Sequence, residues 1–374
     1  MVILKEAVSK ADLKTFIKFP FSLYRDSPYW VPPLISDELN AFDKNTNPAF
    51  KNADAWFYLA YKDNKLVGRI VGIINWVEVK QQQIPKVRFG WFDFIDDTAV
   101  SEALLNKIAE IGREHQLEFI EGPVGFSNLD KVGVLTEGFT EIGSMVTWYN
   151  HPYYADHYTQ HGFQKEKGYV ENKFPAENAD PALFTRLNDL VKKRYKLKEL
   201  NFDNTKDILP LADQMFALFN QTYDKLSSFV PISDAQIAYF KKKYISFINP
   251  EYIKFIVDSK EQLIAFAIVM PSFSKALQKA NGKLFPFGFY HLLKAKKKHR
   301  DVHFYLIGIH PDYQNKGVTA IIFNEYYKTF TANKIDMCYR TPELEDNVAI
   351  RQMWKHFEPV IHKRRATFKK NIDL

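Results

Sequence analysis

The stretch from His303 to Phe330, HFYLIGIHPDYQNKGVTAIIFNEYYKTF, constrains the fold more than any other part of the chain. It begins with the alternating apolar run 303–309, which is typical of a strand. It ends with apolar residues at helical spacing from Ala320 onward. Between them lie a turn with Pro311 and a loop that contains one glycine. The pattern therefore predicts a strand, a loop and a helix in direct succession.

The loop in this stretch has the features of an anion site. It carries few side chains that would crowd a ligand, and a helix is predicted to begin straight after it. The first N–H groups of a helix have no partner within the helix, and the helix dipole favours negative charge at that end. The sequence thus predicts that the backbone here binds a phosphate group, although a plain strand-turn-helix connection fits the same pattern.

The order strand, His-Pro-Asp-Tyr, Gln-x-x-Gly-x-Thr and apolar helix resembles the acyl-CoA-binding signature of the GNAT superfamily of N-acetyltransferases. The usual form is Gln/Arg-x-x-Gly-x-Gly/Ala, so Gln314 and Gly317 match, while Thr319 departs from the expected small residue. A threonine there narrows the phosphate site or adds a hydroxyl contact. The resemblance implies acetyl-CoA or another acyl-CoA as cofactor, and no metal. The residues it implies for cofactor binding are Ile309, Gln314, Asn315, Lys316, Gly317, Val318, Thr319 and Asn347.

A second part of the resemblance lies downstream. Residues 335–340 read as a neighbouring strand, and Asn347 begins a predicted helix that carries Trp354 two turns on. The resemblance implies that the asparagine contacts the pantetheine arm. In the family the aromatic position is often a tyrosine that protonates the departing thiolate, and the indole of Trp354 has no such acidity. The source of that proton is therefore left open.

The chemistry that the resemblance implies is transfer of an acyl group from a thioester to a primary amine, on a small molecule or a peptide. An amine must lose a proton before it attacks, so a base is needed. Glu345 and then Glu343 are the predicted candidates for this catalytic role, and the alternative is that they only satisfy the helix dipole. The backbone N–H of Ile309 or His310 is the predicted donor to the thioester carbonyl.

The length of 374 residues makes two domains the default. The residues up to 175 show the GNAT order of elements, with YTQHGF at 158–163 resembling the family's Tyr-x-x-x-Gly-Phe, but Asp96 and Asp97 stand where a phosphate loop is expected. From 176 the order recurs. We expect an α/β (α+β) protein of two tandem GNAT-like domains, each a mixed, mainly antiparallel twisted sheet flanked by helices. The domains are predicted at 1–175, without an acyl-CoA loop, and at 176–374, with it.

The charge and the cysteine content indicate which partners and which cellular compartment are possible. The net charge of +7 permits nucleic acid, an anionic membrane or an anionic cofactor and selects none of them. With acyl-CoA implied by the resemblance, a nucleic-acid partner is not expected. The one cysteine, Cys338, and the lack of a membrane span or secretory pattern predict a reducing cytoplasm. The basic run 294–300 is predicted to be a solvated surface or a contact to the 3′-phosphate of coenzyme A.

Two other classes of function remain open from the sequence. One is an aminoacyl transferase of the Fem type, which also joins two GNAT-like domains but takes its acyl group from aminoacyl-tRNA. The intact loop at 314–319 favours acyl-CoA instead. The other is a protein that keeps the fold and binds acyl-CoA or another ligand without catalysis, which Thr319 and Trp354 make credible.

Overall fold

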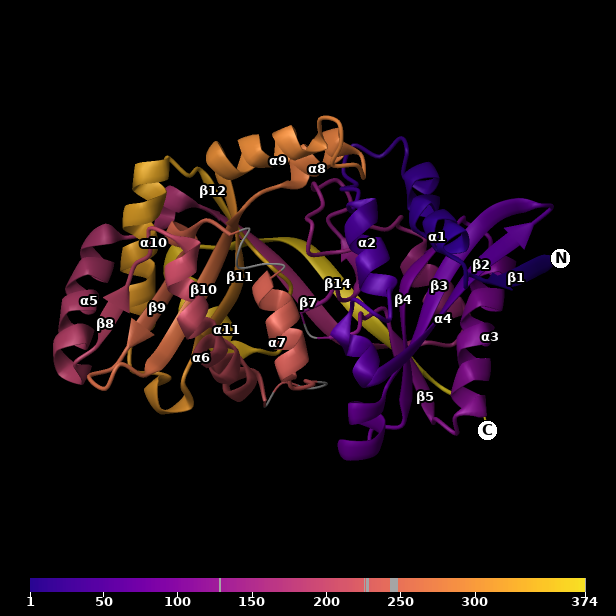
Figure 1. Ribbon diagram of the computed structural model, residues 1–374, viewed down its shortest axis with the longest axis horizontal. Coiled ribbons are helices and arrows are strands. Elements are labelled where there is room, and N and C mark those ends of the chain that lie inside the picture. Colours follow the sequence, from indigo (N-terminus) through magenta and orange to yellow (C-terminus); the bar gives the residue numbers. More distant parts are fainter. Residues whose placement is uncertain (128, 225, 227–228, 243–247, 374) are drawn as a thin grey trace.

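The structure is a computed structural model that describes residues 1–374 apart from 128, 225, 227–228, 243–247 and 374. Its strands form one continuous twisted sheet that runs through the whole molecule, and helices flank the sheet (Figure 1). Among the described strands, two pairs are parallel and the others are antiparallel. The predicted α/β class with a mixed, mainly antiparallel sheet is confirmed.

The elements of the first half follow the predicted order closely. The sequence predicts a helix over 10–24 capped by Ser9, a hairpin over 55–76 and a strand-helix-strand unit over 86–120, and all three are present. The Pro, Asp and Asn content of 26–50 predicts a loop, which was wrong, because 35–42 is helical. The stretch from 124 to 147 is predicted to be irregular, but it contains a short strand. The strands are β1 (Val2–Glu6), β2 (Ala53–Lys62), β3 (Lys65–Asn75), β4 (Lys86–Phe94), β5 (Phe119–Gly122), β6 (Val134–Glu137) and β7 (Gln164–Pro175), and the helices are α1 (Lys10–Leu23), α2 (Ile35–Phe42), α3 (Thr98–Glu114) and α4 (Tyr154–Gln160).

The second half repeats this order and adds a final strand that the sequence did not predict. The sequence predicts a helix over 234–247. Asp234–Phe240 is helical, and 243–247 lie outside the described residues. The strands are β8 (Lys198–Leu200), β9 (Ile253–Val257), β10 (Leu263–Pro271), β11 (Asp301–Ile309), β12 (Met337–Arg340), β13 (Glu343–Leu344) and β14 (Val360–Asn371), and the helices are α5 (Pro181–Tyr195), α6 (Thr205–Tyr223), α7 (Asp234–Phe240), α8 (Ser274–Ala280), α9 (Gly288–Lys297), α10 (Thr319–Asn333) and α11 (Val348–Trp354).

The two halves exchange strands at the centre of the sheet. The strand order is β1-β2-β3-β4-β5-β14-β7-β12-β11-β10-β9-β8, so the last strand of the chain pairs with β5 and β7 of the first half. In turn, β7 pairs with β12 of the second half. Figure 1 shows β7 and β14 crossing the middle of the molecule side by side. Each predicted domain is therefore completed by a strand from the other.

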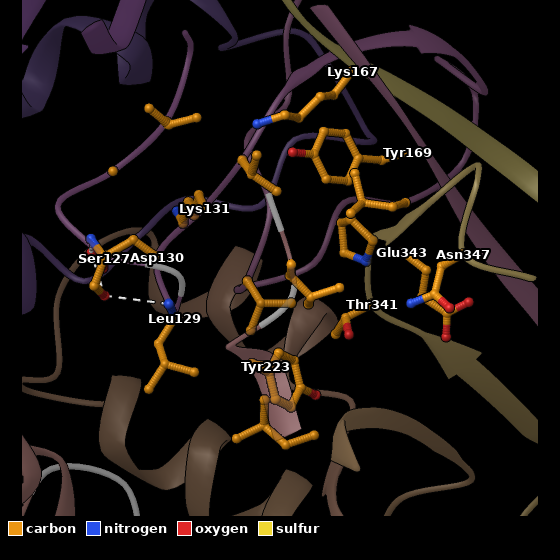
Figure 2. Close-up of a pocket in the computed structure, with 18 of the residues that line it drawn as sticks. Ser127, Leu129, Asp130, Lys131, Lys167, Tyr169, Tyr223, Thr341, Glu343 and Asn347 are labelled. Carbon is orange, nitrogen blue, oxygen red and sulfur yellow. Dashed lines mark hydrogen bonds between the residues drawn. The ribbon is translucent and has the colours of Figure 1, made fainter. Parts of the chain in front are cut away.

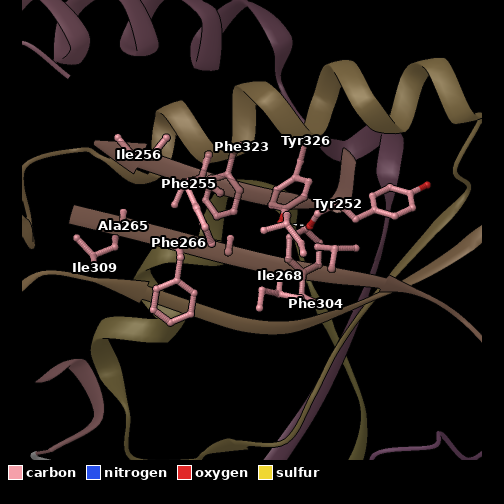
Figure 3. Close-up of a cluster of buried hydrophobic side chains, with 14 of the residues drawn as sticks. Tyr252, Phe255, Ile256, Ala265, Phe266, Ile268, Phe304, Ile309, Phe323 and Tyr326 are labelled. Atoms are coloured by element: carbon pink, nitrogen blue, oxygen red, sulfur yellow. Dashed lines mark hydrogen bonds between the residues drawn. The ribbon is translucent and has the colours of Figure 1, made fainter. Parts of the chain in front are cut away.

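Aromatic packing fixes the position of the loop that follows β11. The core of the second half lies between β9, β10 and β11 on one side and α10 on the other (Figure 3). Phe323 of α10 is buried there, and its ring centre lies 4.9 Å from that of Trp354 and 4.8 Å from that of Phe357. The Tyr326 hydroxyl donates to the Tyr252 carbonyl at 2.9 Å. Because α10 is held against the sheet in this way, its first turn lies at the end of β11.

The strand exchange predicts how fragments behave. Residues 1–175 alone lack β14, so β5 and β7 lose the neighbour that joins them and expose unpaired edges. We expect this fragment to be unfolded or aggregated by circular dichroism and size-exclusion chromatography. Co-expression with 176–374 should restore a folded complex. A folded monomer of 1–175 on its own would contradict the account.

Candidate functional site

The loop after β11 presents free backbone amides. Its φ angles alternate in sign, with +58° at Asn315, +77° at Gly317 and −57° at Val318. Such alternation turns successive N–H groups toward one side and makes an anion-binding concavity. Within the described part of the chain, none of the amides of residues 315–318 has an acceptor. Val318 is buried and anchors the loop, while residues 314–317 are exposed. The loop therefore fits the pyrophosphate of an acyl-CoA.

Side-chain contacts hold this loop in place and, among the described residues, do not involve its backbone amides. The Gln314 Nε2 donates to the carbonyl of Ile309 at 3.1 Å, which ties the loop back to its strand. The ammonium of Lys316 lies 5.5 Å from the ring centres of both Tyr195 and Tyr313. A Cβ on Gly317 would lie 3.1 Å from Val191, in addition to the strain of its positive φ. The loop thus combines free amides with one cation at its edge.

The two parallel strands beside the loop part from each other. β11 pairs with β12 from Asp301 to Phe304, but β11 then continues to Ile309 while the other chain segment turns away after Arg340 into β13. A bulge accompanies the separation. Val269 pairs with Phe304 and Ile268 with Leu306, which leaves Tyr305 as the extra residue.

One of the two backbone N–H groups predicted to donate to the thioester carbonyl already has an acceptor in the sheet. The N–H of His310 donates to the carbonyl of Ile264 at 2.8 Å, so it is not free to donate to a substrate. The predicted donor was the N–H of Ile309 or of His310. His310 was wrong, because its N–H is used in the pairing with β10, and Ile309 stays a prediction.

A cavity of about 250 Å³ lies where the strands part, between the two halves (Figure 2). The second half contributes mainly apolar side chains, and the first half contributes charged ones. Its lining includes Lys86, Arg88, Glu121, Leu129, Asp130, Lys167, Tyr169, Tyr223, Leu226, Phe304, Tyr305, Leu306, Ile307, Thr341, Glu343, Asn347, Ile350 and Trp354. The cavity therefore has a mainly apolar wall next to β11, the strand that leads into the free-amide loop, and a more polar wall opposite.

The polar wall is a buried network of ion pairs. The Lys86 Nζ lies 2.7 Å from Glu121 and 2.9 Å from Glu78, and Lys167 lies 3.3 Å from Glu121. Burial acts to raise the pKa of Glu121, but Lys86 and Lys167 outweigh it and lower the pKa overall. Glu121 thus stays charged and is a poor base. The sequence analysis missed this network, although Lys86 and Arg88 at alternating positions in an apolar strand were a signal for it.

Three tyrosines surround the cavity, and one has a free hydroxyl. Tyr223 donates to the carbonyl of Ile307 at 3.0 Å, and Tyr305 donates to that of Leu129 at 3.4 Å. The hydroxyl of Tyr169, on β7, has no partner among the described residues and points into the cavity (Figure 2). Burial raises the pKa of all three, so they are neutral hydrogen-bonding groups. The sequence analysis did not single out any of them.

The predicted catalytic and cofactor residues fall in different places. Glu343 lines the cavity and forms an ion pair with Arg340. Asn347 also lines the cavity, and its Oδ1 accepts from the N–H of Ile350 at 3.1 Å. Glu345 lies outside the cavity lining and contacts Lys165 at 3.0 Å and Arg364 at 2.7 Å. Burial raises the pKa of Glu345, but these two hydrogen-bonded cations lower it by more.

Trp354 is a packing residue of the core. It is 1% exposed, and its ring lies 4.8 Å from Phe304 and 4.7 Å from the Arg340 guanidinium, centre to centre. Its Nε1 has no acceptor within the described residues. Tyr158 occupies the corresponding place in the first half, buried and stacked on Phe368 of β14. Both aromatic side chains thus pack against the exchanged central strands or their neighbours.

Two other predicted features are placed by the structure. In the first half, Asp97 accepts from the N–H of Ala99 at 3.1 Å and Asp96 contacts His157, so carboxylates occupy the start of α3. The basic run 294–300 precedes the start of β11, whereas the phosphate loop follows its end. A nine-residue strand spans about 25–30 Å, so the run lies far from the loop.

Comparison with known proteins identifies the fold. No family model matches the chain. It is 27% identical over 375 residues to protein YghO of Escherichia coli K12, covering 98% of this chain and 94% of that protein. It is 25% identical over 289 residues to the bacterial ceramide synthase of Caulobacter vibrioides, covering 76% and 73%. A tandem GNAT protein from the clavulanic acid biosynthesis pathway superposes with a TM-score of 0.60 at 10% identity, covering 100% and 99%.

The chain has the tandem GNAT fold. The predicted fold resemblance is therefore confirmed over the whole chain. Among the described residues, no helix combines the length and apolar composition needed to cross a bilayer.

The free amides of this tandem GNAT fold predict a sharp effect of Gly317→Asp. The carboxylate would oppose phosphate, so binding of coenzyme A, measured by isothermal titration calorimetry, should fall below detection. Gly162→Asp is the matched control, because Gly162 also has φ +77° but lies in the first half. It should bind as the wild type does. Equal binding by the Gly317 variant would mean that the site lies elsewhere.

The burial of Trp354 predicts a structural role. Trp354→Phe keeps most ring contacts and removes an N–H without an acceptor, so it should lower stability by about 1–2 kcal/mol in urea unfolding. Once an acceptor amine is known, single-turnover rates should stay within a few-fold of wild type. A folded, cofactor-binding variant that has lost the chemical step would show that the indole acts on substrate.

Proposed function

We propose that this protein is an acyl-CoA-dependent N-acyltransferase that moves an acetyl or longer acyl group to a primary amine held in the cavity between the halves. The observation that carries the proposal is the parting of β11 and β12 beside both the free-amide loop and the cavity. A thioester lying between the strands would have phosphate contacts at one end and an acceptor site at the other.

The chain's own residues would hold the cofactor as follows. The amides of 315–318 and Lys316 bind the pyrophosphate, and the side chain N–H₂ of Asn347 is left to donate to the pantetheine arm. Acyl-CoA supplies a thioester carbonyl that a neutral amine can attack with release of the thiol. For the negative charge on that carbonyl we assign the backbone at the Tyr305 bulge, where one residue leaves the ladder with β10.

The volume of the cavity limits the size of the acceptor amine. About 250 Å³ corresponds to the space of roughly eight water molecules at ~30 Å³ each, so it suits a small amine or the amine-bearing end of a longer molecule. Its buried ion pairs and the Tyr169 hydroxyl suit a polar group on that amine. The name of the Caulobacter relative refers to ceramide, which is an amide, and this supports N-acylation. A thiol-release assay of acetyl-CoA and longer acyl-CoAs against an amine library tests the proposal, and turnover with none of them would contradict it.

The two predicted bases can be separated experimentally. Glu343 lines the cavity and Glu345 does not, so we assign the base to Glu343, which must leave its ion pair with Arg340 to accept the proton. Glu343→Gln should lower kcat by roughly 10²-fold or more with KM for acyl-CoA unchanged, and should remove the acidic limb of the pH profile. Glu345→Gln is the matched control and should stay within a few-fold. The reverse order of effects would move the assignment to Glu345.

A further inference from the structure

The turn before α9 and the outer face of that helix expose an unusual set of apolar side chains. Phe285 and Phe287 are 75% and 71% exposed, and Tyr290 is 56% exposed. Phe289 and Leu293 of the same helix are also exposed. Lys283, Lys294, Lys297 and Lys298 are exposed around them. We call this set the aromatic-basic surface. Large rings held in water carry a free-energy cost, so such a patch marks a contact site.

The charge of the chain is concentrated around this surface. Residues 272–300 contain seven lysines and one arginine and no acidic residue. The remaining 345 residues hold 43 basic and 44 acidic side chains, so they carry −1 of the total +7. The positive excess of the protein therefore lies in one segment, next to the exposed rings.

The base of the aromatic-basic surface is firmly packed. The Ser274 hydroxyl donates to the carbonyl of Gly143 at 2.7 Å, and Gln278 Nε2 donates to that of Trp30 at 2.9 Å. Leu292 of α9 is buried in a small core with Val31 and Phe273. The outward rings are thus presented by a fixed support, with α8 and α9 along the upper edge of the molecule in Figure 1.

We propose that the aromatic-basic surface docks onto an anionic phospholipid bilayer. The rings of Phe285, Phe287 and Phe289 enter the boundary between headgroups and acyl chains, and the lysines contact lipid phosphates. Aromatic side chains favour that boundary, and clustered lysines are attracted by the negative surface potential of anionic lipid.

Other partners fit the surface less well. A nucleic-acid duplex would use the lysines but would leave the phenylalanine rings in water. A single strand stacks its bases on such rings, and the RNA arm of the test below separates it from lipid. A symmetric contact with a second copy would bring two segments of +8 together, which repel. The proposal does not depend on the proposed reaction, because the surface precedes β11 and the phosphate loop follows it.

Vesicle co-sedimentation of the full chain tests the proposal. We expect binding to vesicles of phosphatidylcholine and phosphatidylglycerol in equal parts, weaker binding at high salt, and much weaker binding to phosphatidylcholine alone. The triple variant Lys294→Gln, Lys297→Gln, Lys298→Gln should weaken partition about 100-fold, at about fivefold for each lysine. The control Lys14→Gln, Lys18→Gln, Lys51→Gln removes the same charge from other exposed positions and should bind nearly as the wild type does.

The rings need their own variant. Phe285→Ser, Phe287→Ser, Phe289→Ser should weaken partition at least tenfold, while the control Val8→Ser, Leu190→Ser, Leu209→Ser, also at exposed apolar positions, should not. Circular dichroism and an unchanged urea unfolding midpoint confirm that each variant is folded. Absence of vesicle binding, or loss equal to that of the controls, would overturn the proposal. So would binding to an RNA oligonucleotide but not to vesicles, or a dimer in ultracentrifugation that the phenylalanine variant abolishes.

Discussion

The exchange of β7 and β14 between the halves is the constraint on which the rest of the structure depends. These two strands form the centre of the sheet, and each completes the half to which it does not belong in sequence. A buried ion pair accompanies the exchange, since Arg365 of β14 contacts Glu171 of β7 and both are almost fully buried. Removing one partner of such a pair leaves an uncompensated charge, so the two strands stabilise each other.

The cavity is a consequence of this arrangement. Because β7 follows β12 in the sheet, its Lys167 and Tyr169 face the strands that part around Phe304. The first half has carboxylates where a phosphate loop would lie, yet it supplies the buried network of ion pairs that lines one side of the cavity. The halves therefore divide the proposed task, with the cofactor on the second half and the polar contacts to the acceptor on the first.

The sequence alone predicted those elements for which the apolar periodicity and the turn residues indicate the same local structure. The hairpins, the capped helix after Ser9 and the loop from Gln314 to Thr319 were predicted because apolar period and turn residues define them locally. β14 was not predicted, because the charged side chains of Lys363 and Arg365 point into the protein. The strand therefore lacks the alternation of apolar and polar residues that marks a half-buried strand. Their partner, Glu171, lies almost two hundred residues away in the chain. The free hydroxyl of Tyr169 likewise depends on long-range pairing, so no local signal marks it.

A crystal structure with coenzyme A bound would test the central claim most directly. The account predicts the pyrophosphate against the amides of 315–318, the pantetheine arm between β11 and β12, and the thiol at the mouth of the cavity near Tyr305 and Glu343. Coenzyme A bound in the first half near Asp97, or lying outside the gap between the two strands, would contradict it.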